Sequence, residues 1–168
     1  MLKLAMLYIN QINQKDGFSD EEVRDILHSF FKDFGKKEKV MAIPPDMTRF
    51  YSGSGLITKI MHEYYGDTLT DIIPAVGSHF PMTEEEIDKM YGVPYHLFRP
   101  HNWRKDVTRI GTIPGDYIKE LSNGKLDYDW PVDVNKLVVD GGHDAIFSIG
   151  QVVPHEVIGM ANYNKNIF

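Results

Sequence analysis

Two histidines stand where apolar stretches of the sequence give way to polar ones. His79 follows the apolar run 72–76, and His155 follows the run 145–149. Histidine takes and gives a proton near neutral pH, because its ordinary pKa is about 6.5. Two such side chains on opposite sides of one substrate carbon would act in turn as base and acid, which is what racemisation requires. The alternative is that both are ordinary loop histidines.

Three charged residues add binding chemistry. The planar guanidinium of Arg49 can bind a carboxylate or a phosphate. Asp46 can orient Arg49 or hold a ligand hydroxyl, or it can simply cap the segment that follows it. Lys165 can be a covalent anchor or a positive charge in the site, or it can be a solvated surface lysine. Gly159 and the two asparagines after it favour a loop, which would let Lys165 and His155 face one pocket.

The other candidate patterns are weaker. His96 and His101 are five residues apart with no carboxylate between them, so we predict no metal ligands there. Gly53-Ser54-Gly55 lacks the third glycine of the dinucleotide-binding fingerprint. The chain has no cysteine, which excludes disulfides, thiolate metal sites and cysteine nucleophiles.

Three segments carry the signals of helices that would position these residues. Two begin with a capping box, in which a Ser or Thr side chain and a Glu three residues later satisfy each other's backbone N–H groups. The third follows two glycines, and apolar side chains recur at helical spacing in all three. The expected helices cover residues 20–34, 56–65 and 84–91.

Apolar and β-branched runs predict the strands. The runs 40–43, 72–76 and 146–153 each lead into one of the polar segments described above, and further strands are expected at residues 1–12, 97–98, 107–110, 132–134 and 136–139. Strands alternate with helices, so we predict a single α/β domain over residues 1–168, with a mostly parallel sheet and helices on both faces in three layers. Parallel strands end at one edge of a sheet, so these polar segments should converge on one cleft.

Composition narrows the class of protein. The 168 residues are 42% hydrophobic and 25% charged, which is typical of a soluble globular domain. The net charge of −6 and the lack of a long basic run argue against a nucleic-acid surface. No apolar run approaches the roughly 20 residues that span a bilayer. We therefore expect a cytoplasmic protein that binds neither nucleic acid nor membrane.

Taken together, the polar segments resemble those of the nickel-dependent lactate racemase family. Residues 46–49 resemble its Asp-x-Thr-Arg loop, and residues 77–86 resemble its Gly-x-His-x-Pro-Met-Thr-x-Glu-Glu loop. Pro154-His155 followed by Lys165 resembles its Pro-His…Lys segment at the same spacing. The three motifs occur in family order, from about residue 40 to the end of the sequence.

The resemblance implies a Rossmann-like α/β fold and racemisation or epimerisation of a small 2-hydroxy acid such as lactate. It implies a nickel pincer nucleotide, joined covalently to Lys165, that takes a hydride from the substrate carbon and returns it. The histidines matched by His79 and His155 would move the hydroxyl proton. Arg49 would bind anionic groups of the substrate or the cofactor, and Asp46 and Thr48 would help to hold the cofactor.

The sequence departs from the family in two respects. Residues 160–165 read Met-Ala-Asn-Tyr-Asn-Lys, where lactate racemases have a Ser-Gly-Gly-Arg-Lys segment. The sequence also ends before the family's nickel-ligating histidine and its carboxy-terminal domain. We therefore expect an amino-terminal piece that by itself neither retains the cofactor nor turns over substrate. Its expected partners are the substrate, the missing domain and, through an exposed sheet edge, a second copy.

A second hypothesis belongs to another functional class. A domain of the same fold can be a non-catalytic module that holds a small anion or a nucleotide at Asp46, Arg49 and His79. The two hypotheses differ at Lys165, because only the enzyme requires a covalent adduct there.

Overall fold

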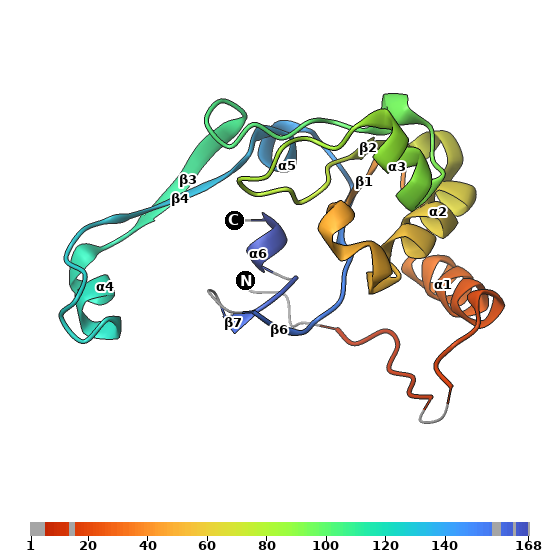
Figure 1. Cartoon of the computed structure of the whole chain (residues 1–168), viewed down its shortest axis with the longest axis horizontal. Coiled ribbons are helices and arrows are strands. Elements are labelled where there is room, and N and C mark those ends of the chain that lie inside the picture. The colour runs from red at the N-terminus through yellow and green to blue at the C-terminus, as the bar shows by residue number, and fades with distance from the viewer. Residues whose placement is uncertain (1–5, 14–15, 156–158, 163, 168) are drawn as a thin grey trace.

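The computed structural model describes residues 6–13, 16–155, 159–162 and 164–167 (Figure 1). A parallel sheet with strand order β2-β1-β5 lies at the centre of the fold. Its strands are β1 (Val40–Ile43), β2 (Leu69–Ile72) and β5 (Ala145–Ser148). All three run in one direction, so their carboxyl ends lie at one edge of the sheet. The predicted parallel α/β fold is confirmed.

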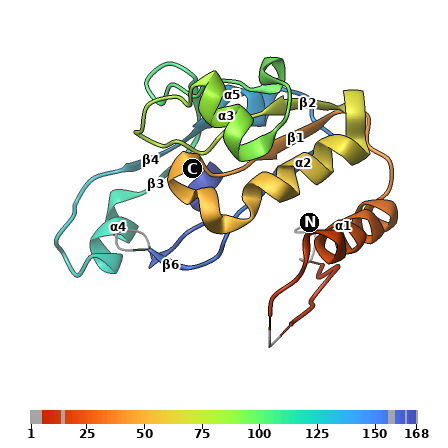
Figure 2. The same ribbon diagram turned by 45° about the vertical axis from the view of Figure 1, so that its right-hand side comes forward.

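Three helices pack on one face of the sheet: α1 (Asp20–Phe34), α2 (Ser54–Tyr65) and α3 (Glu84–Tyr91). They match the predicted helices, both predicted capping boxes are present, and α1 and α2 lie side by side (Figure 2). Alternate side chains of β1, Val40 and Ala42, point to this face, as the two-residue period of a strand requires. The larger core lies here, and its buried residues are Phe31, Val40, Ala42, Ile60, Met61, Tyr65, Leu69, Ile72, Ile87, Met90, Tyr91, Val93, Phe98 and Ile149.

The opposite face carries two shorter helices, α5 (Lys136–Asp140) and α6 (Asn164–Ile167). Met41 and Ile43 point to this face and form a smaller buried cluster with Ile73. Apolar side chains from both helices pack against that cluster; they are Leu137, Val138 and Ile167. Helices therefore cover both faces of the sheet, as predicted for a three-layer arrangement.

Several strand boundaries differ from those predicted. β2 begins at Leu69 and ends at Ile72, and residues 73–76 continue as an irregular segment. Residues 136–139 form helix rather than strand, because the Asn135 side chain accepts the Leu137 N–H at 2.9 Å and so caps α5. β5 ends at Ser148, well before Pro154. Residues 6–12 lie outside any strand, and Phe98 makes only an isolated bridge to Ile72.

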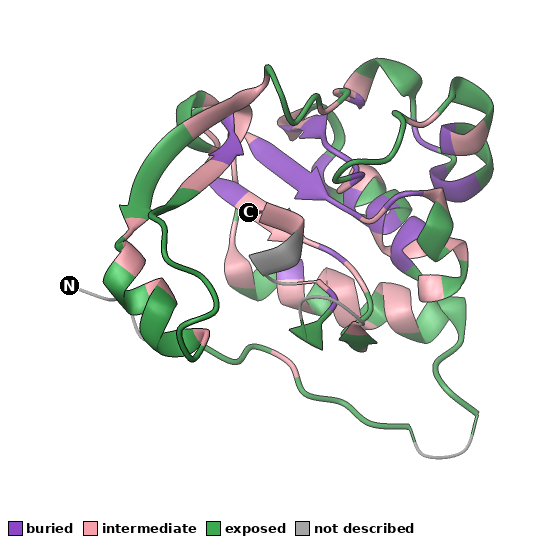
Figure 3. Cartoon of the chain, turned by 60° about the vertical axis from the view of Figure 1, so that its left-hand side comes forward, coloured by how far each residue is buried: buried purple, intermediate pink, exposed green. Residues whose placement is uncertain are grey.

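The remaining strands form two antiparallel pairs. β3 (Val107–Ile113) and β4 (Trp130–Asn135), with α4 (Gly115–Leu121) between them, make an arm that projects from the sheet (Figure 1). Most of this arm is exposed (Figure 3). β6 (Pro154–His155) pairs with β7 (Gly159–Met160). Short 3-10 helices cover Met47–Ser52, Gly66–Thr68 and Tyr95–Leu97. Within the described residues, none of the helices has the length and apolar character needed to cross a membrane.

A buried carboxylate fixes the β2 edge of the sheet. The Arg99 Nε and His143 Nε2 atoms donate to the two oxygens of Asp71, at 2.7 and 2.8 Å, and the Thr70 hydroxyl donates at 2.7 Å. The Asp71 residue is only 7% exposed. Burial alone would raise the pKa of Asp71, but the hydrogen bonds from these three residues and the charge of Arg99 hold it below its ordinary value of 3.8.

This lowered pKa predicts a pH dependence of stability. A carboxyl group with a depressed pKa in the folded state stabilises the fold above the unfolded pKa, and that stabilisation is lost as the pH falls through the folded pKa. Asp71→Asn should lower the free energy of unfolding by about 2 kcal/mol at pH 7. As the pH falls from the ordinary aspartate pKa through the lowered pKa of folded Asp71, the free energies of unfolding of wild type and variant should converge, as measured by urea unfolding. The exposed pair Asp133–Arg109 serves as control, and Asp133→Asn should have a much smaller effect. If the free energies of unfolding of wild type and Asp71→Asn differed by the same amount at every pH, the lowered pKa of Asp71 would be contradicted.

Candidate functional site

A cavity of about 430 Å³ lies where the chain leaves the carboxyl ends of the three parallel strands. Its lining comes from the segments that follow β1, β2 and β5, and it includes five of the six site residues predicted from the sequence: Asp46, Thr48, Arg49, His79 and His155. The sixth, Lys165, lies in α6, and its side chain is outside the described part of the structure. The predicted convergence therefore places these five residues around one space, which we call the Asp46 cavity.

Asp46 is held by the turn that follows β1. Its Oδ1 atom accepts the Thr48 N–H at 3.1 Å and also accepts the Thr48 hydroxyl. Asp46 is thus the N-cap of the 3-10 helix Met47–Ser52, which is the simpler role considered for it above. The residue is 5% exposed, so its second oxygen has a direction fixed by the surrounding fold.

That second oxygen binds His79. The Asp46 Oδ2 atom lies 2.7 Å from His79 Nδ1, a contact that was not among the roles considered for Asp46 above. An ionised carboxylate only accepts hydrogen bonds, so Nδ1 carries the proton and the neutral ring has its lone pair on Nε2. The His79 side chain is 58% exposed, whereas that of Asp46 is 8% exposed. A buried carboxylate therefore sets the tautomer of an accessible imidazole that lines the cavity, with Nε2 as the proton acceptor.

Backbone contacts beyond the strand ends position this pair. The Ala75 N–H donates to the Pro44 carbonyl at 2.7 Å, so the segments after β1 and β2 stay side by side. The His79 N–H then donates to the Val76 carbonyl at 2.9 Å and turns the chain toward Asp46.

Tyr91 supports the same turn from the end of α3, a role that was not predicted from the sequence. Its hydroxyl donates to the Pro45 carbonyl, next to Asp46. Burial, with a contribution from the charge of Asp46, raises the pKa of the Tyr91 hydroxyl, so it remains a donor. The only sequence signal for this role was the position of a tyrosine at a helix end.

Arg49 supplies positive charge to the cavity. It is exposed, and its backbone leaves the helical region, with φ −113° and ψ 33°. Among the described residues, no carboxylate lies within ion-pair distance of its guanidinium. Arg49 can therefore bind an anionic ligand without first breaking an internal ion pair.

An amide network orders the third wall, and this too was missed from the sequence. The Asn162 side chain accepts from the Ser148 hydroxyl and from Asn166 Nδ2, each at 2.8 Å, and donates to the Gly150 carbonyl at 2.8 Å. Asn162 adopts a left-handed conformation with φ 64°, which asparagine tolerates better than most residues. This network joins the end of β5 to α6 across the cavity. His155, half-buried in β6, lines the same space.

Comparison with known proteins places this cavity in a family. The model of the lactate racemase N-terminal domain matches residues 20–168. The chain belongs to the lactate racemase N-terminal domain family. No curated protein matches it. Within the described residues of this lactate racemase domain, no group of three or more His, Asp or Glu side chains is placed to hold a metal ion.

Two solved structures share the fold of this lactate racemase domain. A protein from Thermotoga maritima is 27% identical with a TM-score of 0.77, over 86% of this chain and 36% of its own. The lactate racemase apoprotein from Thermoanaerobacterium thermosaccharolyticum is 22% identical with a TM-score of 0.51, over 71% of this chain and 27% of its own. The domain thus spans about a third of the length of these structures.

Proposed function

We propose that this chain contributes the proton-transfer half of the site of a 2-hydroxy-acid racemase or epimerase that uses a nickel pincer nucleotide. The observation that carries the proposal is the hydrogen bond of 2.7 Å between Asp46 and His79, at a cavity that His155 and Arg49 also line. Membership of the lactate racemase N-terminal domain family supports it.

The donors of the Asp46 cavity fit an anionic nucleotide and an anionic substrate. Asp46 uses one oxygen on Thr48 and the other on His79, so both of its oxygens already have hydrogen-bond donors within the protein. The groups left to meet a ligand are the Arg49 guanidinium and neutral donors such as Gln151. The volume of the Asp46 cavity, about 430 Å³, lies within the range of small-molecule sites, about 300–1,000 Å³.

The residues of this chain would manage the substrate's carboxylate and its hydroxyl proton. Arg49 binds the carboxylate and so fixes the carbon that reacts. The His79 Nε2 atom accepts the hydroxyl proton, while Asp46 stabilises the imidazolium that forms. His155 performs the same transfer for the opposite enantiomer, which gives one base to each face. When bound, a nickel pincer nucleotide supplies the hydride acceptor, and Lys165 is its proposed attachment point.

The test is the intact mass of this chain and of a longer version that carries a carboxy-terminal domain, each co-expressed with the enzymes that build the cofactor. In the longer version we expect a nucleotide-sized increment that maps to Lys165 and disappears in Lys165→Ala. Lys125→Ala is the control, because Lys125 is an exposed lysine on the projecting arm, and this variant should keep the adduct. An unmodified longer version that still binds inorganic phosphate through Arg49 would reject the enzyme and favour the non-catalytic anion-binding module.

A further inference from the structure

A second cavity of about 310 Å³ adjoins the Asp46 cavity on the α5 face of the sheet. The two cavities share three lining residues, Ala75, Gly77 and Asn166. At Gly77 a Cβ atom would meet nothing within 4 Å, so the boundary between the cavities is not filled there. We call this second space the His101 pocket, and the mechanism proposed above does not use it.

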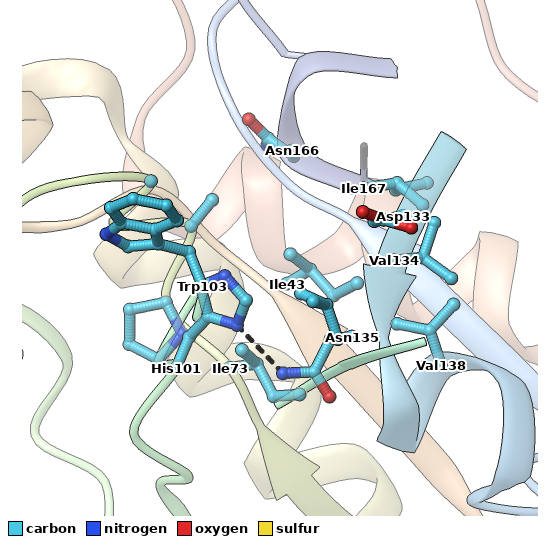
Figure 4. Close-up of a pocket in the computed structure, with 14 residues that line it drawn as sticks. Ile43, Ile73, His101, Trp103, Asp133, Val134, Asn135, Val138, Asn166 and Ile167 are labelled. Carbon is cyan, nitrogen blue, oxygen red and sulfur yellow. Dashed lines mark hydrogen bonds between the residues drawn. The ribbon is translucent and has the colours of Figure 1, made fainter. Parts of the chain in front are cut away.

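The walls of the His101 pocket are mainly apolar. Figure 4 shows Trp103 and His101 on one side, facing a wall from β4, α5 and α6, with Ile43 and Ile73 between the two sides. The facing apolar side chains are Val134, Val138 and Ile167. Such walls favour an apolar ligand group, because its transfer from water is favourable.

His101 gives the pocket one oriented donor. The Asn135 Oδ1 atom accepts the Leu137 N–H, so its Nδ2 faces His101 and donates to the Nδ1 atom at 2.9 Å. An Nδ1 that accepts requires the proton of the neutral ring to be on Nε2. Burial lowers the pKa of His101, against the opposing charge of Asp106, which keeps the ring neutral. Within the described part of the chain, no hydrogen-bond acceptor meets that Nε2–H, which lies on the Trp103 side of the ring (Figure 4).

Trp103 forms a partly exposed wall of the pocket and presents the flat face of its indole ring. The residue is 46% exposed, so it covers the space without being part of the sealed core. The Arg104 guanidinium lies 3.7 Å from the centroid of its ring. This cation–π contact holds the indole plane in place and makes it a surface for another ring.

We propose that the His101 pocket binds the aromatic side chain of the substrate, and that a hydroxyl oxygen on the aromatic ring accepts the hydrogen bond of the His101 Nε2–H. This rests on the proposed function, since the pocket adjoins the cavity in which Arg49 and His79 would hold the carboxylate and hydroxyl. Apolar cavities of about 150 Å³ accept a benzene ring, so about 310 Å³ leaves room for a substituted phenyl group. The substrate class is therefore aryl-bearing 2-hydroxy acids rather than lactate itself.

The test uses Trp103 as the reporter. The chain has two tryptophans, and Trp130 lies on the projecting arm, so Trp130→Phe leaves Trp103 as the only one. Lactate, 3-phenyllactate and 3-(4-hydroxyphenyl)lactate are titrated in this background. We expect 3-phenyllactate to bind at least about 10-fold tighter than lactate and to shift the Trp103 emission. The hydroxyphenyl acid should bind about 5-fold tighter still, because its oxygen meets the His101 donor.

Two pairs of variants locate the effect. Val138→Phe fills the pocket and should abolish the preference for aromatic acids, while Val139→Phe, next to it on α5 but exposed, should keep the preference. His101→Phe should remove only the gain from the ring hydroxyl, while His96→Phe, at an exposed position, should not. If His101→Phe fails to fold, the comparison of Val138→Phe with Val139→Phe still tests whether the pocket binds the aromatic group.

Equal affinities for lactate and 3-phenyllactate, or binding that leaves Trp103 emission unchanged, would overturn the proposal. Arg49→Gln separates it from the proposed function. If all three acids weaken in parallel in Arg49→Gln but show no aromatic preference in wild type, the pocket proposal fails and the site proposal stands. If the aromatic preference is present and Arg49→Gln has no effect, the pocket stands as an aryl-binding site and the racemase assignment of the Asp46 cavity fails.

Discussion

Asp46→Asn is expected to move the proton of His79 to the other ring nitrogen. The Thr48 N–H can only donate, so the amide oxygen of the new asparagine must stay at Thr48 and its NH₂ group must face His79. His79 Nδ1 then accepts, and the ring proton moves to Nε2. Nε2 thereby becomes a donor and can no longer take a proton from a substrate hydroxyl.

Two measurements follow from this change. Nitrogen-15 NMR of the imidazoles should show His79 as the Nδ1–H form in wild type and the Nε2–H form in Asp46→Asn. In a cofactor-loaded longer version that carries a carboxy-terminal domain, racemisation should fall by about 10²–10⁴-fold, because Asp–His pairs lose activity through the wrong tautomer. Thr48→Val is the matched control, since it removes a hydroxyl from Oδ1 and leaves Oδ2 on His79. An unchanged Nδ1–H form in Asp46→Asn would refute the role given to Asp46.

Gly55→Ala is expected to destabilise the fold, although the same change stabilises most helices. Alanine is favoured over glycine within a helix by about 1 kcal/mol. At Gly55, however, an added Cβ would lie 2.0 Å from the carbonyl oxygen of Met90 and 3.1 Å from its carbon. Both atoms belong to the backbone of α3, so relief requires α2 and α3 to separate rather than a side chain to rotate.

We expect the free energy of unfolding to fall by about 3 kcal/mol, at the upper end of ordinary overpacking costs. Denaturant unfolding measures it, with Gly111→Ala as control. Gly111 lies in β3, where an added Cβ meets nothing within 4 Å, so stability should be unchanged or slightly higher. A more stable Gly55→Ala would show that α2 and α3 are not in close contact. The change should also disturb the cavity, because Tyr91 at the end of α3 supports Pro45.

The sequence by itself predicted the three longest helices, α1, α2 and α3, and five residues that line the Asp46 cavity. Capping boxes and apolar spacing act within a few residues, so Ser19 and Thr83 marked two helix starts without knowledge of the rest of the fold. The motifs around Asp46, His79 and His155 were equally local. Their meeting at one edge followed from the α/β alternation, because parallel strands end on the same side.

Only the tertiary structure decided which side chains pair. Asp46 and His79 are 33 residues apart in the sequence. Only the fold shows that the Oδ2 atom of Asp46 binds His79 and not Arg49. Residues 136–139 looked like a strand because they are apolar and β-branched, but the cap from Asn135 and the packing of Val138 on the sheet make them helical. The His101 pocket likewise depends on elements more than 30 residues apart. Such pairings depend on distances across the fold, which local spacing does not encode.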